Sequence, residues 1–271
     1  MLQCRKAATY TIPVPTVGLI QSSVSLNASA KLTLLAARER AIENINIAIA
    51  GAGRMGKAVA ESIEQDSAFG LIGTWQRGTD IEALVGAADV VVDFSMPDGT
   101  EVVVAAAVKY KKPLVCGVSG LSDKLMAKLH AAGSQIPLVF DRNMSLGIAV
   151  LERTVRNAAA TLGREFAVTI SETHHVHKKD APSGTALKLG EAIARSRGES
   201  GTGQIQFEVE RRGEVPGDHE VVMSSATERL SFTHSVTTRR VFALGALRAA
   251  QWLVAQPPGL YNMQDVLFGK R

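Results

Sequence analysis

Three histidines and two lysines crowd together in the stretch Ser171–Thr185, which runs SETHHVHKKDAPSGT. Histidine titrates near neutral pH and can give or take a proton, so His174, His175 and His177 are candidates for acid–base chemistry. Lys178 can neutralise a carboxylate or donate a proton to developing negative charge. The composition of this stretch therefore predicts an acid–base site that binds an anion.

Two other interpretations of the same stretch are an exposed basic loop and a histidine-rich metal site. Lys178 and Lys179 would repel a cation, and no thiol lies near in the sequence. We therefore predict no metal here.

Ser183-Gly184-Thr185 stands where a helix is predicted to begin. The first turn of a helix has free backbone N–H groups and a partial positive charge, which together favour an anion. This would be a second anion site on the same loop, so the segment Glu172–Thr185 predicts a substrate with two carboxylates.

A second motif, Gly51-x-Gly53-x-x-Gly56, ends a predicted strand and opens a predicted helix. The first glycine permits a tight turn, the second lets the backbone approach a pyrophosphate, and the third lets helix and strand pack closely. In this strand–loop–helix context the motif predicts a dinucleotide site. The alternative is a glycine-rich turn without a ligand.

The end of the second predicted strand should select between NADH and NADPH. Many dinucleotide sites have an acidic residue there for the ribose hydroxyl, whereas this chain has Trp75-Gln76-Arg77-Gly78. Gln76 can bind a hydroxyl, and Arg77 can pair with a 2′-phosphate or stack on adenine. We expect NADPH to be used at least as well as NADH, the alternative being that Arg77 is a solvated loop residue.

The elements that must position these motifs alternate in the first half of the chain. Such alternation predicts a Rossmann-like α/β fold with a doubly wound parallel sheet. Strands are expected at Ile45–Ala50, Phe69–Trp75, Val90–Phe94, Pro113–Gly117 and Ile136–Phe140, with helices up to Gln65, near Asp80–Gly86, at Asp98–Lys111, and at Ser122–Ala132 with Ser122 as the N-cap.

After Ser145 the regular alternation of strands and helices ends, and the order of the predicted elements indicates a smaller α+β region. Its last three runs alternate apolar and polar residues, as antiparallel strands with one buried face do. Helices are expected at Leu146–Leu162, Gly184–Arg197 and about Arg239–Val254, and strands at Phe166–Glu172, Gln204–Arg211, His219–Ala226 and Arg229–Val236.

These patterns suggest residues 45–143 with 239–271 as a dinucleotide-binding domain and residues 144–238 as a substrate-binding and oligomerisation domain. Residues 1–44 form an N-terminal extension without acidic residues up to Arg38. Its composition suits a disordered tail, a start codon placed too far upstream, or an organellar transit peptide. We expect a cytoplasmic protein, or a plastid one if the extension is a transit peptide.

The bulk composition excludes several other classes. The chain has 271 residues and a net charge of +4 at pH 7, spread along its length and not gathered as a nucleic-acid footprint would be. Cys116 lies in an apolar run and is expected to be a small core residue, and Cys4 is far from it. No apolar run approaches the roughly 20 residues that span a bilayer.

The motif Glu172-x-His-His-x-His-Lys-x-Asp-Ala-Pro-Ser-Gly-Thr-Ala186 resembles the signature of the 4-hydroxy-tetrahydrodipicolinate reductase (dihydrodipicolinate reductase) family. Ala48–Gly56, Asp93–Thr100, Gly117–Gly120 and Asn143–Gly147 resemble further motifs of that family, and the resemblance runs from Ile45 to about Phe268. The segments 77–93 and 204–219 look shorter than in many members.

The resemblance implies roles for individual residues. His174 would be the general acid/base and Lys178 the proton donor, while His175, Gly184 and Thr185 would bind the substrate's carboxylates. Arg239 would support the active site. The implied cofactor-binding residues are Gly51, Ala52, Gly53, Arg54, Met55, Gln76, Arg77, Gly117, Val118, Ser119, Asp141, Arg142, Asn143 and Met144.

The resemblance also implies the reaction. NADPH or NADH would deliver a hydride to a ring carbon of an unsaturated cyclic dicarboxylate, water would leave, and tetrahydrodipicolinate would form in lysine (diaminopimelate) biosynthesis. The family is usually tetrameric, so we expect a homotetramer. The alternatives are another Rossmann oxidoreductase, such as an amino-acid dehydrogenase, and a non-catalytic regulator that binds the cofactor.

Overall fold

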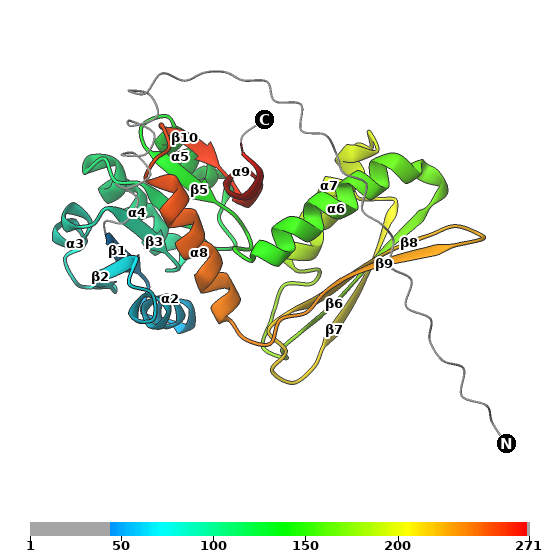
Figure 1. Ribbon diagram of the computed structural model, residues 1–271, viewed down its shortest axis with the longest axis horizontal. Coiled ribbons are helices and arrows are strands. Elements are labelled where there is room, and N and C mark those ends of the chain that lie inside the picture. The colour runs from blue at the N-terminus through cyan, green and yellow to red at the C-terminus, as the bar shows by residue number, and fades with distance from the viewer. Residues whose placement is uncertain (1–43, 270–271) are drawn as a thin grey trace, which may run out of the picture. The chain divides into compact units, whose positions relative to one another are not determined.

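The computed structural model describes residues 44–269, and in this part of the chain two separate β-sheets are built. Figure 1 shows helices packed around the first sheet, while two helices lie along one face of the second. The predicted N-terminal extension lies outside the described residues, apart from Asn44. None of the described helices is long and apolar enough to cross a membrane.

The first sheet has six strands in the order β10-β5-β4-β3-β1-β2, and all neighbouring strands are parallel. This confirms the Rossmann-like doubly wound sheet. The strands are β1 (Ile45–Ala50), β2 (Phe69–Trp75), β3 (Val90–Asp93), β4 (Leu114–Cys116), β5 (Pro137–Phe140) and β10 (Gly259–Tyr261).

Helices cover both faces of this sheet, which explains why its central strands are apolar at nearly every position. One buried cluster joins the sheet to α2, α8 and α9, and the other joins it to α3, α4 and α5. The helices are α2 (Arg54–Glu64), α3 (Ile81–Ala87), α4 (Pro97–Lys109), α5 (Asp123–Gly133), α8 (Arg240–Leu253) and α9 (Met263–Phe268). Ser122 caps α5 as predicted, because its side chain accepts a hydrogen bond from the N–H of Leu125. Cys116 is fully buried, also as predicted.

The second sheet has the order β7-β6-β8-β9 and consists of β6 (Ala167–His174), β7 (Ile205–Arg211), β8 (Asp218–Ser224) and β9 (Arg229–His234). Helices α6 (Leu146–Leu162) and α7 (Gly184–Ser196) cover one face and bury its apolar side chains (Figure 1). A short 3-10 turn, Gly163–Glu165, joins α6 to β6. The opposite face of β6 and β7 carries polar side chains, among them Ser171, Thr173, Glu208 and Glu210.

The expectation of antiparallel pairing was wrong for one strand of this sheet. β7 runs parallel to β6, whereas β8 and β9 are antiparallel to their neighbours. The reason is the connection: α7 carries the chain back along the sheet between β6 and β7, so β7 starts from the same end as β6. Alternation of apolar and polar residues reports one buried face and does not report strand direction.

A buried ionic group ties α7 to the first sheet. The Lys188 ammonium on α7 lies 2.7 Å from both carboxylate oxygens of Asp141, which directly follows β5, and 3.0 Å from Glu152 on α6. The Asp141 carboxylate also accepts the N–H of Met263 at the start of α9. These bonds fix the loop after β5 against the helix that begins at the predicted anion site.

Candidate active site

The loop between β1 and α2 has the close packing that its glycines predicted. A Cβ on Gly51 would lie 2.6 Å from the carbonyl oxygen of Phe94, and one on Gly56 would lie 1.8 Å from the carbonyl oxygen of Gly51. Gly51 also has a φ of +105°, a region open mainly to glycine. Gly53 faces open space and is the N-cap of α2 without a side-chain cap, so the first N–H groups of α2 stay free for an anion.

A cavity of about 220 Å³ lies beside this loop, at the ends of β1, β2 and β3. Gly51, Ala52 and Gly53 line it, together with Gln76 and Arg77. The Arg77 guanidinium is exposed and lies 3.8 Å from the Asp98 carboxylate, a weak pair that leaves it free to turn to another anion. The open helix start and this cavity fit a dinucleotide.

The two further loops that were predicted to bind the cofactor follow β4 and β5. Gly117 packs tightly, because a Cβ there would lie 2.3 Å from the Phe94 ring. Val118 is buried, and Ser119 follows it on the loop after β4. Both loops start at the carboxyl ends of their strands. Because all strands of this sheet are parallel, these ends lie at the same edge as Gly51, which follows β1.

In the loop after β5 the side chains of all four predicted cofactor residues are engaged within the protein. Asp141 pairs with Lys188, Arg142 lies 3.1 Å from Glu191, and Met144 is buried in the core. The Asn143 amide donates to the hydroxyl of Thr185 at 3.0 Å. The loop thus joins the predicted cofactor side to the start of α7.

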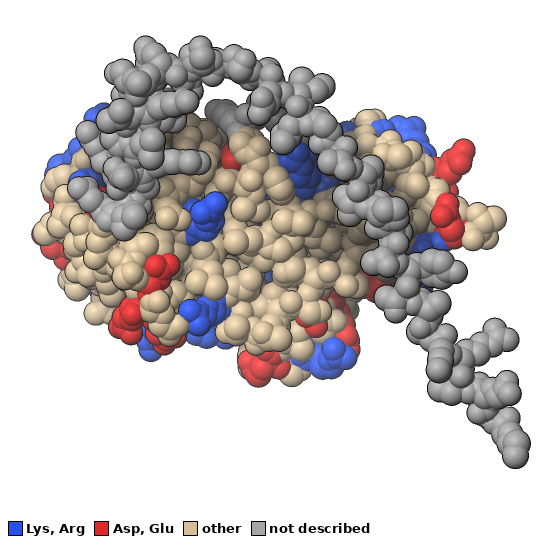
Figure 2. All heavy atoms as spheres, in the orientation of Figure 1, with Lys and Arg blue, Asp and Glu red and all other residues tan. Residues whose placement is uncertain are grey.

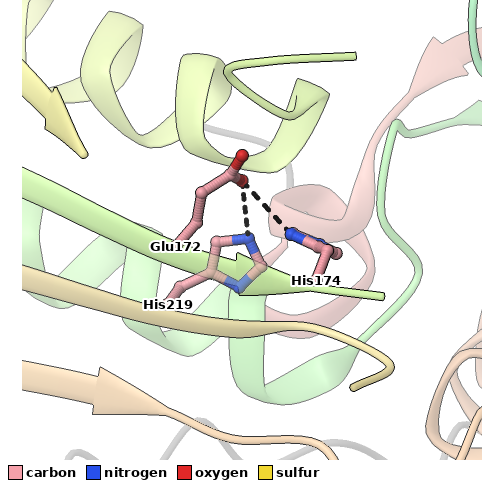
Figure 3. Close-up of side chains that lie close together, drawn as sticks. All are labelled: Glu172, His174 and His219. Atoms are coloured by element: carbon pink, nitrogen blue, oxygen red, sulfur yellow. Dashed lines mark ion pairs between the residues drawn. The ribbon is translucent and has the colours of Figure 1, made fainter. Parts of the chain in front are cut away.

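The predicted catalytic segment begins on a strand and not in a loop, because β6 continues to His174. Glu172 and His174 are buried and alternate with half-buried positions, so both point to the face that α7 covers. His219 on β8 is the register partner of Glu172. Figure 3 shows the Glu172 carboxylate directed toward both imidazole rings. Its Oε2 lies 3.5 Å from Nδ1 of His174 and 3.8 Å from Nε2 of His219.

Burial determines the protonation of these histidines. Burial, followed by the positive charges of Lys178 and Arg211, lowers the pKa of His174 to about 4. Burial, followed by the charge of His174, lowers the pKa of His219 to about 3. Both rings are therefore neutral at pH 7 in the free protein.

Lys178 lies close to His174 on the loop after β6, and its Nζ lies 2.8 Å from the Asp180 carboxylate. Burial alone would raise the pKa of Asp180, but the hydrogen bond and the charge of Lys178 outweigh it, and the pKa is lowered. Arg211 on β7 fixes this loop, because its guanidinium donates to the backbone carbonyls of Lys178 and Asp180.

The start of α7 is built as predicted, but one of its N–H groups has a partner. Ser183 caps the helix by accepting from the N–H of Ala186, and the N–H of Gly184 donates to the Asp180 carboxylate at 3.3 Å. Thr185 is buried beside Asn143. Asp180 thus occupies one position that was predicted for a substrate carboxylate.

His175 brings the two predicted sites together. Its pKa is lowered first by burial and then by the positive charges of Arg239 and Arg54. Burial and the charge of Arg54 also lower the pKa of Arg239. Arg54 of the predicted cofactor loop and Arg239 before α8 therefore create one positive region around His175 of the predicted catalytic segment. His177 is exposed, with its ring 6.0 Å from that of His175 and its Nε2 3.3 Å from the Glu214 carboxylate.

Two residues of this site, Glu172 and His219, had no role in the sequence-based prediction. His219 lies 45 positions beyond His174 along the chain, but the two rings stack edge to face with centroids 5.1 Å apart. Among the described residues, Glu172, His174 and His219 also form the one group of His, Cys, Asp and Glu side chains spaced to hold a metal ion. The nearby charges of Lys178 and Arg211 oppose a cation there.

Comparison with known proteins agrees with this geometry. Residues 45–144 match the family model described as dihydrodipicolinate reductase, N-terminus, and residues 147–267 match dihydrodipicolinate reductase, C-terminus. A 4-hydroxy-tetrahydrodipicolinate reductase of Zymomonas mobilis is 41% identical over 241 residues, which cover 81% of this chain and 95% of that protein. One of Halorhodospira halophila is 39% identical over 82% of this chain and 89% of its own length.

The fold has a solved counterpart. The dipicolinate-bound dihydrodipicolinate reductase from Paenisporosarcina sp. TG-14 superposes with a TM-score of 0.70 at 20% identity, over 83% of this chain and all of that one. The resemblance drawn from the motif is confirmed, and the chain belongs to the dihydrodipicolinate reductase family.

Proposed function

We propose that this protein reduces 4-hydroxy-tetrahydrodipicolinate to tetrahydrodipicolinate with NADPH or NADH, in lysine (diaminopimelate) biosynthesis. One observation carries the proposal beyond family membership. The neutral ring of His174, the Lys178 ammonium and the start of α7 lie around one loop, and His175 on this loop lies within the electrostatic influence of Arg54 from the predicted cofactor loop.

We propose the same division of labour as the sequence suggested. Residues 45–143 with 239–271 bind the dinucleotide, and residues 144–238 bind the substrate and make subunit contacts. All strands of the first sheet lie within residues 45–143 and 239–271, and all strands of the second sheet lie within residues 144–238. This distribution supports the division.

The cofactor has a matching site on this chain. Gly51 to Met55 hold the pyrophosphate at the free N–H groups of α2, and Gln76 and Arg77 contact the adenosine side. Gly117, Val118 and Ser119, with Asp141 to Met144, line the nicotinamide side. Asp141, Arg142 and Met144 do so through their backbone, since their side chains have other partners.

Loss of the 4-hydroxyl as water leaves an unsaturated substrate ring, to which a bound nicotinamide would supply a hydride. The ring would then be electron-rich and enamine-like and would have to take up a proton, which Lys178 donates. His174, with its pKa near 4 in the free protein, accepts a proton more readily once a dianionic substrate lies beside it, because negative charge stabilises the imidazolium. His175, Gly184 and Thr185 bind the carboxylates, and Arg239 adds positive charge.

The test is NADPH oxidation coupled to dihydrodipicolinate synthase, which supplies the substrate. His174→Gln and Lys178→Ala should each lower kcat by about 10²–10⁴-fold, the usual contribution of a positioned acid. His130→Gln, an exposed histidine on α5, is the matched control and should leave kcat unchanged. Turnover near that of the unmodified protein in either active-site variant would contradict its role. No turnover at all in the unmodified protein would favour a regulator.

Cofactor preference is a separate proposal. We infer that NADPH serves at least as well as NADH, because Arg77 beside the adenosine cavity has only one weak partner. Arg77→Ala should raise KM for NADPH more than KM for NADH. A strong preference of the unmodified protein for NADH would overturn this proposal.

We also propose a homotetramer in the cytoplasm. The polar face of the second sheet, which no helix of the described chain covers, is the surface offered to partner subunits. On the face drawn in Figure 2, Lys and Arg side chains lie in small groups among Asp and Glu. Sedimentation of the purified protein tests the tetramer, and N-terminal sequencing of the native protein tests whether residues 1–44 are a targeting segment.

A further inference from the structure

We propose that Glu172 is a positioning residue, which holds the His174 ring in the tautomer with a proton on Nδ1 and fixes the start of α7 at the same time, with His219 as its second imidazole partner. This inference rests on the proposed role of His174. It concerns a carboxylate that makes no contact with the predicted cofactor loop.

The two oxygens of Glu172 have different surroundings. Oε1 accepts the N–H of Ser183 at 2.9 Å and lies 3.4 Å from the Arg211 guanidinium. Oε2 is buried and has no hydrogen bond, although Nδ1 of His174 and Nε2 of His219 face it at 3.5 and 3.8 Å. Those two nitrogens are also buried without a partner. Because buried polar atoms are rarely left unpaired, we infer that Oε2 is the common acceptor for both rings.

This arrangement selects a tautomer. A neutral imidazole carries one N–H, and the nitrogen that faces a carboxylate must be the one that carries it. His174 therefore keeps its proton on Nδ1 and a free lone pair on Nε2. A Cβ on Gly217 would lie 3.0 Å from that Nε2, so the glycine leaves this edge of the ring uncovered.

Glu172 also connects the remaining parts of the site. Through Ser183 it holds the first residues of α7, where Gly184 and Thr185 begin the helix. Through Arg211 it is joined to the backbone of Lys178, because the same guanidinium donates to that carbonyl. One buried carboxylate thus contacts the acid–base ring, the helix start and the support of the lysine loop.

The same atoms could instead hold a divalent cation, since they lie within 4.8 Å of one another. The positive charges of Arg211 and Lys178 favour protonated ring nitrogens over a bound metal ion at this place. Arg211 already neutralises Glu172, and the charges of Lys178 and Arg211, which lower the pKa of His174, would repel a metal ion in the same way. Dialysis against a chelator should leave activity unchanged, and loss of activity that zinc restores would overturn the proposal.

The first test uses the unmodified full-length protein without cofactor. Nitrogen-15 NMR of histidine-labelled protein at pH 7, with His174→Gln to identify its signals, should show His174 as the neutral Nδ1–H tautomer. The Nε2–H tautomer or a fully protonated ring would contradict the proposal. This measurement decides the matter even where a Glu172 variant fails to fold.

The second test is Glu172→Gln. Its amide oxygen can still accept from Ser183, so its NH₂ group must face His174 and force the ring to the opposite tautomer. We expect kcat to fall by about 10²–10⁴-fold, as when a histidine is left in the wrong tautomer, with KM little changed. Loss of the negative charge also lowers the pKa of His174, so the limb of the kcat profile that falls with rising pH should move to lower pH.

The matched control is Glu228→Gln in the turn between β8 and β9. Its side chain is exposed and lies outside the polar face of β6 and β7 that is proposed for subunit contacts. The variant removes the same charge from the region of the second sheet, and both kcat and the pH profile should stay unchanged. An equal shift of the profile in both variants would mean that net charge, and not contact with His174, is responsible.

A double variant separates this inference from the proposed function. If Glu172 acts through His174, then Glu172→Gln should add less than about 3-fold to the loss already caused by His174→Gln, whereas independent roles would multiply. Full turnover in His174→Gln would remove the proposed role of His174 itself. A large loss in His174→Gln with an unchanged kcat and pH profile in Glu172→Gln would overturn the positioning role alone.

Discussion

Asp180 makes two contacts that a substrate carboxylate is proposed to make, one with the Lys178 ammonium and one with the N–H of Gly184. A dianionic substrate must compete with it for both. Asp180→Asn keeps an acceptor for Gly184 but releases the lysine and removes a repelling charge. We expect KM for the substrate to fall by a few-fold, a modest effect because the pair is half exposed.

Steady-state kinetics with the substrate varied at saturating NADPH tests this expectation. KM for NADPH serves as the internal control and should not change, since the cofactor loop has no contact with Asp180. A rise in the substrate's KM would show that Asp180 mainly orders the loop.

At the same scale, the sequence led to predictions for residues of one motif but gave no role to Glu172 within that motif or to His219, which stands apart. Three histidines and two lysines within fifteen residues singled out the motif, and the resemblance to the family then implied the roles of His174, Lys178 and Thr185. His219 could not be found in this way, since its contact with Glu172 depends on the pairing of β6 with β8. One signal was present in the sequence. His219 stands two and four residues before Val221 and Met223, so it faces the same buried side of the strand.

The helices and strands that are long enough to show a repeating pattern of apolar residues were predicted within a few residues of their observed bounds. β10 and α9 were missed because a three-residue strand and a six-residue helix are too short to show a period. The order of the strands and the parallel direction of β7 depend on crossover connections, which local patterns do not record.

Helix α8 meets the loop after β5 at Gly245, and this contact leads to a prediction about packing. A Cβ on Gly245 would lie 1.7 Å from the carbonyl oxygen of Met144, which is backbone and cannot turn aside. Gly245→Ala should therefore push α8 away from the loop. Although alanine favours a helix, we expect the free energy of unfolding to fall by about 1–3 kcal/mol, and KM for NADPH to rise as the loop moves.

Urea unfolding and steady-state kinetics measure these two effects. Gly201→Ala is the matched control, because a Cβ there meets no atom within 4 Å and its φ is not in the left-handed region. Unchanged stability in Gly245→Ala would show that α8 can shift without cost.

On the scale of the whole molecule, the buried neutral histidines make stability depend on pH. In the unfolded chain His174 and His219 would have pKa values near 6.5, whereas in the fold burial holds them at about 4 and about 3. Between these values the unfolded chain binds more protons than the folded one. The contribution of these histidines to the free energy of unfolding is therefore fully present above about pH 6.5 and is lost as the pH falls toward 4.

Each such histidine can contribute at most about 1.4 kcal/mol per pH unit to this slope. We expect the free energy of unfolding, measured with urea at one protein concentration from pH 7.5 to 4.5, to fall steadily below pH 6.5. His219→Asn removes one titrating group from the core and should make the slope shallower, whatever its effect on stability at pH 7.5. His130→Gln, exposed on α5, should leave the slope as it is. An identical slope in His219→Asn and in the unmodified protein would show that other groups, and not the histidines around Glu172, carry the acid sensitivity.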